Sequence, residues 1–419
     1  MRWFLPAGIC ALGALAPACP ALAGTDLLPA SVAPQPHGFE TGGWVLSPHL
    51  DIALGVSGQS GPRGGQAAIV QNWQMLRARR PLGPGSIELR LLSSLEPWTL
   101  PPDGVPQLLQ AGESFRGKPL IDRQHPHDLV MELAGEYAVP LAPEAEFFVY
   151  GGPAGSPALG PPAYLHRASS GDNRNAPLGH HLQDSTHVAF GVVTVGARLG
   201  EFQVEASQFN GREPDEARHD LEFRPLDSYA LRASYAPGDH VAMQVSTGYL
   251  AGPQALEPGD LLRTTASLLV AGVAGRGRRF AAALIWGRNE PRAGHRGGTL
   301  DSAGLEGALD LAPALRGHGR LEVVDRDELG LPGEAAHTVH RVGALTLGLA
   351  REIGDYETFG LAAGADLTFI VPDAAVAAAY GPNPLGFRVF LRLGPPVEPP
   401  AAPPIEHPPG HAPATTGVR

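Results

Sequence analysis

Cysteine is almost missing from this chain of 419 residues: Cys10 and Cys19 are the only two, and both lie near the amino terminus. A basic residue and an interrupted apolar stretch precede the tripeptide Ala21-Leu22-Ala23, which has the small-residue pattern that signal peptidase recognises. We therefore predict a signal peptide over residues 1–23 and export of the remainder. The exported part has no cysteine, so backbone hydrogen bonds or a large core must stabilise it without disulfides.

Long apolar runs and an excess of basic residues are also missing. No run of about eighteen apolar residues follows residue 23, which excludes a helical membrane span. Lysine and arginine number 31 against 42 aspartates and glutamates, a formal net charge of -11. A chain without a basic surplus lacks the electrostatic signature of nucleic-acid binding, so no nucleic-acid partner is expected.

What the chain does have is period-two alternation of polar and apolar residues. Residues 201–207 (EFQVEAS) alternate without a break, and residues 86–91, 227–235 and 240–246 do the same. A strand places the two classes on opposite faces, whereas a helix would spread the apolar residues round its circumference. Segments of about ten residues with this alternation are typical of strands that cross a membrane in a barrel.

Short breaks rich in proline and glycine separate these segments. The breaks are residues 81–85, 140–143, 199–200, 237–239, 275–278, 313–317 and 353–355. Longer polar connections alternate with them. The pattern predicts an all-β, transmembrane, antiparallel up-and-down β-barrel of about 16 strands (range about 14–18), with short periplasmic turns and long extracellular loops.

The predicted barrel covers residues 41–394 and follows a short N-terminal segment, residues 24–40. Residues 386–393 (GFRVFLRL) alternate strictly and are the expected closing strand. Residues 395–419 are rich in proline, so we expect a disordered tail there.

Charged residues are expected to line the lumen. If the apolar face of each strand meets lipid, alternation directs Glu132 and Glu136 inward, and on other strands Arg90, Arg232 and Arg263. Opposed acidic and basic walls would create a field that orients polar solutes in a pore. The alternative is that these side chains form salt bridges with one another and narrow the lumen.

Histidine and acidic residues gather in three motifs at the entrances of long loops: residues 122–128 (DRQHPHD), 178–187 (LGHHLQDSTH) and 209–220 (FNGREPDEARHD). The predicted orientation places all three on one extracellular rim. Imidazole and carboxylate ligands suit a divalent ion such as Zn²⁺, Cu²⁺ or Ni²⁺, and no other cofactor is expected. The candidate metal ligands are His125, His127, Asp128, His166, His180, His181, Asp184, His187 and His219. The alternative is a hydrogen-bonded network that folds the loops into the mouth.

A weaker hypothesis is catalytic. Ser185 and His187 can share one face of a strand and act as nucleophile and base, with Asp184 approaching to orient the histidine. A barrel enzyme of this kind would act on membrane lipid or lipopolysaccharide. An enzyme is nevertheless the less favoured hypothesis.

The three motifs, together with residues 263–267 (RTTAS) and 384–387 (PLGF), resemble an uncharacterised family of Gram-negative outer-membrane β-barrel proteins. The resemblance covers nearly the whole exported chain. It implies location in the outer membrane and a role near metal handling, and it implies no catalytic residues.

The favoured hypothesis is a porin-like outer-membrane barrel. It would bind or pass a small polar or cationic solute, for which a divalent transition metal is one candidate, at a mouth rich in histidine and carboxylate. Its expected partners are outer-membrane lipid, lipopolysaccharide and the barrel assembly machinery, and assembly as a homo-trimer is compatible with the class. The alternatives are the barrel enzyme and a structural or adhesive barrel without transport.

Overall fold

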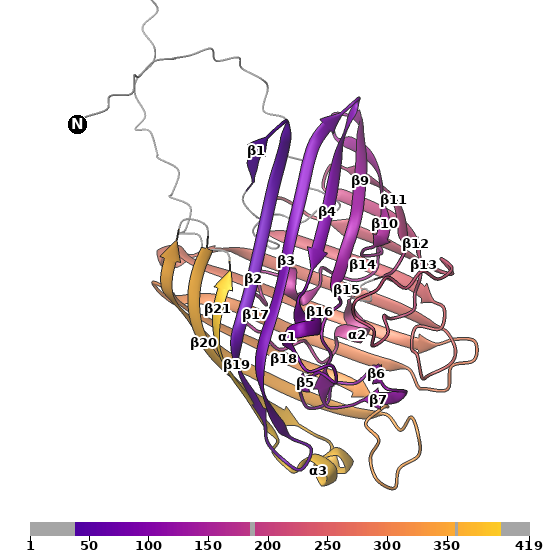
Figure 1. Ribbon diagram of the computed structural model, residues 1–419, viewed down its shortest axis with the longest axis vertical. Coiled ribbons are helices and arrows are strands. Elements are labelled where there is room, and N and C mark those ends of the chain that lie inside the picture. Colours follow the sequence, from indigo (N-terminus) through magenta and orange to yellow (C-terminus); the bar gives the residue numbers. More distant parts are fainter. Residues whose placement is uncertain (1–37, 185–188, 357–358, 395–419) are drawn as a thin grey trace, which may run out of the picture.

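Sixteen antiparallel strands form a barrel that closes on itself. The computed structural model describes residues 38–184, 189–356 and 359–394. The last strand, β21, pairs with the first strand of the barrel, β2, and every other strand pairs with its neighbours in chain order (Figure 1). The strands are β2 (Trp44–Gln59), β3 (Gly65–Leu82), β4 (Gly85–Ser93), β9 (Val130–Ala142), β10 (Ala145–Ala154), β11 (Val192–Leu199), β12 (Phe202–Phe209), β13 (Ser228–Tyr235), β14 (Val241–Leu250), β15 (Leu261–Ala274), β16 (Arg278–Pro291), β17 (Leu300–Ala312), β18 (Leu315–Arg326), β19 (His340–Tyr356), β20 (Phe359–Val371) and β21 (Leu385–Gly394). The predicted fold class is therefore confirmed.

The barrel spans residues 44–394, three residues less at its start than predicted. The end of the predicted N-terminal segment is not outside the sheet, because β1 (Phe39–Thr41) pairs with the beginning of β2. The expected signal peptide and the proline-rich tail lie outside the described residues. Among the residues that the structure describes, no helix has the length and hydropathy needed to cross a membrane.

Most charged and polar residues of the strands lie inside the barrel, and most of their large apolar residues lie outside. On β12, Gln203 and Glu205 are 1% and 5% exposed, whereas Phe202 and Val204 are 56% and 50% exposed. This arrangement is the reverse of a water-soluble sheet, in which the apolar face is buried. It arises directly from the alternation in the sequence, and it suits a barrel whose exterior contacts lipid.

The connections divide into two groups at the two ends of the barrel. Seven short connections join the strands at the turn end, and eight connections, most of them longer, lie at the loop end. One predicted turn, residues 353–355, is wrong because β19 continues to Tyr356. The glycine there lies beside a register shift against β20, between Glu352 and Gly354, so it marks a bulge instead of a turn.

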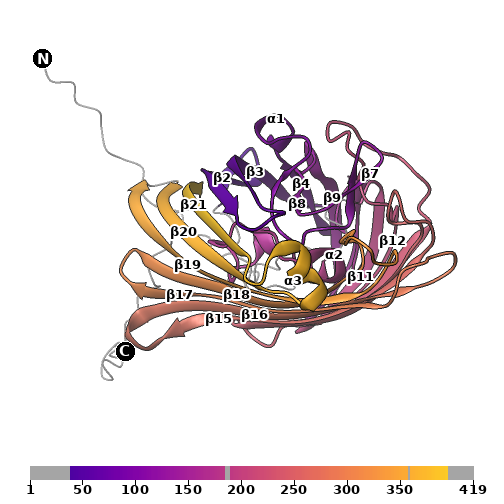
Figure 2. The ribbon, with the colours of Figure 1, turned by 90° about the horizontal axis from the view of Figure 1, so that it is seen from below.

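The two longest connections fold back toward the barrel. Residues 94–129 contain α1 (Glu96–Thr99), β5 (Val105–Pro106), β6 (Glu113–Phe115), β7 (Lys118–Leu120) and β8 (Arg123–Gln124), in which β5 pairs with β8 and β6 with β7. Residues 155–191, here called the inner loop, contain η1 (Tyr164–His166) and α2 (His180–Gln183). The remaining helices are η2 (Gly275–Gly277) at the turn end and α3 (Ala374–Tyr380) at the loop end. The view from the loop end shows α2 inside the ring of strands (Figure 2).

An apolar cluster fixes α2 and its neighbours against one wall. Leu178 and Leu182 of the inner loop pack with Val324, Val342 and Ile370 on β18, β19 and β20. Burying such aliphatic side chains stabilises by roughly 1.5–3 kcal/mol each. The inner loop is therefore held by apolar packing as well as by the polar contacts described below.

Candidate functional site

The inner loop runs along the inside of the barrel wall and narrows the lumen. Successive residues of the loop form hydrogen bonds to strands progressively farther round the barrel, from β12 to β2. Ala158 N donates to Ser207 Oγ on β12 at 2.7 Å, and Gly160 N donates to Ser246 Oγ on β14 at 2.8 Å. Arg167 Nε then donates to Glu306 Oε1 on β17 at 2.7 Å, and Arg174 Nη1 donates to Asp51 Oδ1 on β2 at 2.7 Å. The loop then turns back, and α2 packs against β15, β16 and β17.

Acidic and basic side chains alternate along the inner wall instead of facing each other across it. Arg90 on β4 lies 2.6 Å from Glu88 Oε1 and 3.2 Å from Glu136 Oε2, and within 3.9 Å of Glu132. Arg198 on β11 pairs with the other oxygen of Glu136 at 2.8 Å. Inward-facing residues of adjacent strands are lateral neighbours, so opposite charges there pair directly. The structure favours the salt-bridged lumen over opposed walls.

The two other predicted lumen residues form hydrogen bonds to the inner loop. Arg232 pairs with Glu205 at 2.7 Å and donates to the carbonyl oxygen of Gly160 at 3.0 Å. Arg263 donates to Asn289 Oδ1 at 2.9 Å and to the carbonyl oxygen of Asp184 at 3.0 Å. Both arginines therefore act between the wall and the loop.

Three of the predicted metal ligands come together at the loop end, joined by two glutamates. Donor atoms of His125, His180 and His181 lie within 4.8 Å of one another, and so do those of Glu113, His181 and Glu213. We call these five residues the His–Glu cluster. Glu213 lies inside the third sequence motif, but nothing in the sequence distinguished it from its acidic neighbours. Glu113 lies outside all three motifs, and nothing in the sequence indicated a functional role for it.

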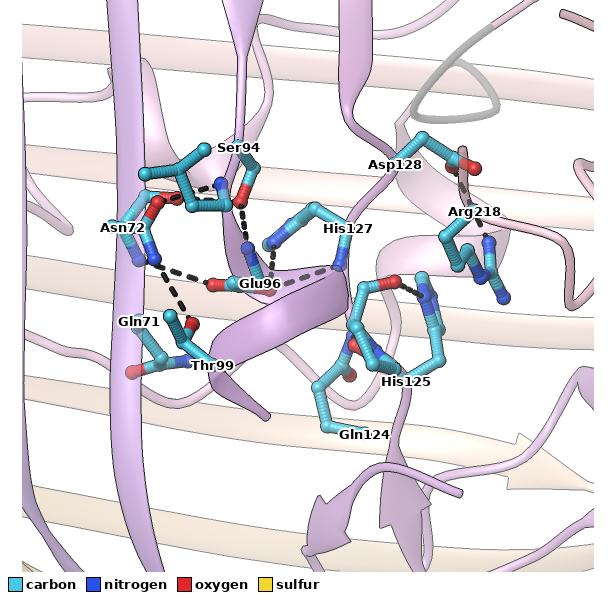
Figure 3. A network of polar contacts seen from close by, with 12 residues as sticks. Gln71, Asn72, Ser94, Glu96, Thr99, Gln124, His125, His127, Asp128 and Arg218 are labelled. Carbon is cyan, nitrogen blue, oxygen red and sulfur yellow. Dashed lines mark hydrogen bonds and ion pairs between the residues drawn. The ribbon is translucent and has the colours of Figure 1, made fainter. Parts of the chain in front are cut away.

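Two of the other predicted ligands, His127 and Asp128, have partners outside the cluster (Figure 3). The Nδ1 atom of His127 lies 2.7 Å from Glu96 Oε2 of α1, and Asp128 pairs with Arg218 at 3.3 Å. The ring of His219 lies 4.9 Å from that of Trp98, between centroids. His166 ends η1 and, among the described residues, is not part of either donor group.

Of the three residues in the catalytic hypothesis, the structure describes Asp184. Asp184, the residue expected to orient the histidine, pairs with Arg167 at 3.3 Å. Ser185 and His187 lie outside the described residues.

In the His–Glu cluster, burial and neighbouring charges shift pKa values in opposite directions. Burial alone would lower the pKa of His181, but Glu213 beside it raises that pKa overall. Burial raises the pKa of Glu113, although Arg218 acts against this. The carboxylates thus sit where water contributes little to their solvation, and nearby cations decide their charge.

A small cavity of about 30 Å³ borders the cluster, lined by His181, Glu213 and Glu328 among other residues. Burial, and then the neighbouring Asp327, raise the pKa of Glu328 to about 7. A polar cavity of this size has room for about two water molecules.

The pKa of Asp184 should make the stability of the folded chain depend measurably on pH. Burial raises its pKa to about 6, although Arg167 lowers it. The folded chain therefore holds this proton more tightly than the unfolded chain, so the stabilisation is complete below about pH 4 and is lost as the pH rises through 6. We expect the free energy of unfolding of Asp184→Asn, relative to wild type, to rise by roughly 3 kcal/mol between about pH 4 and pH 7. Denaturant unfolding in detergent micelles measures this difference, and a difference independent of pH would contradict it.

Comparison with known proteins shows the fold. No protein family model matches the chain, and no curated protein matches its sequence. Among solved structures, OprB of Pseudomonas putida is similar with a TM-score of 0.53 and 9% identity, over 84% of this chain and 94% of that chain. OmpF of Salmonella typhi has a TM-score of 0.51 and 9% identity, over 85% and 99%. The outer membrane channel DcaP of Acinetobacter baumannii has a TM-score of 0.50 and 10% identity, over 85% and 99%. The chain therefore has the closed sixteen-stranded barrel fold of outer-membrane proteins.

Proposed function

We propose that the chain is an outer-membrane channel of porin type that binds or passes a small polar or cationic solute, and that the specific cation is a divalent transition metal. The observation that carries this proposal is the inner loop, which lines a charged lumen and is bonded to strands from β12 round to β2. A barrel with an apolar exterior and a charged interior suits an aqueous lumen within a membrane. A loop that narrows the lumen limits passage to small solutes.

The charges at the loop end support a preference for cations. His181 and Glu213 of the His–Glu cluster line one small cavity together with Asp327 and Glu328. The chain as a whole carries a formal net charge of -11. Acidic groups at a channel mouth raise the local concentration of cations.

Conductance of the refolded full chain in planar lipid bilayers tests the channel function. We expect stepwise conductance. The reversal potential in a KCl gradient should show that the channel is more permeable to K⁺ than to Cl⁻. Circular dichroism and a heat-dependent shift in gel migration would establish in parallel that the barrel is folded. A folded barrel that conducts nothing would overturn the proposal and favour a structural barrel.

A further inference from the structure

The His–Glu cluster draws its donors from three separate connections. Glu113 and His125 belong to residues 94–129, His180 and His181 to the inner loop, and Glu213 to the connection after β12. Long loops have no general reason to bring three imidazoles and two carboxylates to one point. All five side chains are largely shielded from water: His125 and His180 are 5% and 1% exposed.

Backbone contacts orient two of the imidazoles toward the centre of the cluster. The Nδ1 atom of His125 lies 2.9 Å from the carbonyl oxygen of Pro126, and that of His180 lies 2.7 Å from the carbonyl oxygen of Pro177. A carbonyl oxygen only accepts, so each Nδ1 carries a proton, and each ring in its neutral form presents its lone pair at Nε2. Histidines that bind metals commonly make this contact to a backbone carbonyl with their other nitrogen.

The glutamates complete the arrangement. His125 Nε2 lies 3.2 Å from Glu113 Oε1, and the other oxygen of Glu113 accepts from Arg218 at 2.9 Å. A lone pair and a carboxylate oxygen at this distance repel each other unless a shared proton or a metal ion lies between them. His181 Nδ1 lies 3.2 Å from Glu213 Oε1, which is the carboxylate–histidine contact found behind many metal ligands.

We propose that His125, His180, His181 and Glu113 bind one divalent transition-metal ion of the Zn²⁺, Cu²⁺ or Ni²⁺ class, with Glu213 orienting His181. Three nitrogen donors and one oxygen donor suit these borderline ions, whereas Ca²⁺ and Mg²⁺ require mainly oxygen ligands. The adjoining cavity of about 30 Å³ provides room for a water ligand. The site deepens the proposed function by naming its cation, but binding itself does not require a conducting channel.

The ion would also join the three connections to one another. Because a ligand that binds only the folded state stabilises it by mass action, occupancy should raise the temperature at which the loop end unfolds. The ion therefore acts as a cross-link between the inner loop and its two neighbours.

The test uses the untagged full chain, refolded in detergent and stripped with a chelator. We expect isothermal titration to show one Zn²⁺, Cu²⁺ or Ni²⁺ ion per chain, a rise in unfolding temperature with the ion, and no saturable binding of Ca²⁺ or Mg²⁺. His125→Ala and His180→Ala should each weaken binding by at least about 100-fold. Glu113→Gln keeps the shape of the side chain and should weaken binding; because Arg218 loses a charged partner at 2.9 Å, circular dichroism of the metal-free variant establishes that it is folded.

His219→Ala is the matched control, since His219 is an exposed histidine on the same connection as Glu213. It should bind the ion as wild type does. Absence of saturable binding, equal binding of Ca²⁺, or unchanged affinity in the folded His125→Ala and His180→Ala variants would overturn the site. Conductance is recorded on the same preparations: a channel that conducts but binds no ion overturns only the metal site, and a silent barrel that binds the ion overturns only the channel.

Discussion

Replacing Arg167 with methionine is expected to release the inner loop from the wall and to raise single-channel conductance. Arg167 is buried, and its guanidinium group pairs with Glu306 on β17 at 2.7 Å and with Asp184 at 3.3 Å. It also donates to the carbonyl oxygen of Pro162 at 2.8 Å, which binds the loop to itself. Removing one partner of a buried ion pair costs up to roughly 3–5 kcal/mol, and here Arg320, which pairs with Glu306 at 3.1 Å, retains part of the charge compensation.

Conductance in planar bilayers and limited proteolysis of the folded barrel measure this effect independently. In the variant Arg167→Met we expect larger conductance steps and faster cleavage within residues 155–184. Arg292→Met is the matched control, since Arg292 and Glu290 form an exposed pair that contributes little. Wild-type conductance and cleavage in Arg167→Met would refute the role of this anchor.

Replacing Gly287 with alanine is expected to displace α2 and to abolish metal binding. Gly287 on β16 faces α2, and a Cβ atom there would lie 2.0 Å from the carbonyl oxygen of Leu182 and 2.9 Å from Gln183 Cα. These are backbone atoms that no side-chain rotation can move away. Overpacking of this kind costs about 1–3 kcal/mol, and the helix that carries His180 and His181 would have to move.

Gly304→Ala provides the control on the adjacent strand. Its Cβ atom would lie 3.6 Å from Gln183 Nε2, which is ordinary contact with a side chain. We expect Gly304→Ala to keep the metal-dependent rise in unfolding temperature and Gly287→Ala to lose it. The same metal response in both variants would show that the position of α2 does not depend on this close approach.

The strands and their number were predictable from the sequence because the signal for them is local. Alternation within a segment such as residues 201–207 specifies both faces of β12 without reference to any other part of the chain. The closing strand was predicted over residues 386–393, within the observed β21 (Leu385–Gly394). The turn predicted at residues 353–355 failed because a glycine forms a bulge as readily as a turn, and only pairing with β20 distinguishes the two.

The partners of the histidines could not be predicted from the local sequence. His125 and His127 are two residues apart in one motif, residues 122–128, which was expected at the entrance of a long loop. The structure places His125 in the His–Glu cluster and His127 against Glu96 of α1. Which partner each ring meets depends on how residues 94–129 fold back, and alternation says nothing about that path.

By itself, then, the sequence determined a membrane-type barrel of about 16 strands and a loop end rich in histidine and acid. Only the tertiary structure decided that the inner loop lines the lumen, that wall charges pair sideways, and that Glu113 and Glu213 join three histidines. The physical reason is the range of the interactions. Strand faces follow from neighbouring residues, whereas Arg167 meets Glu306 across 139 positions of the chain, and His181 meets Glu213 across 32.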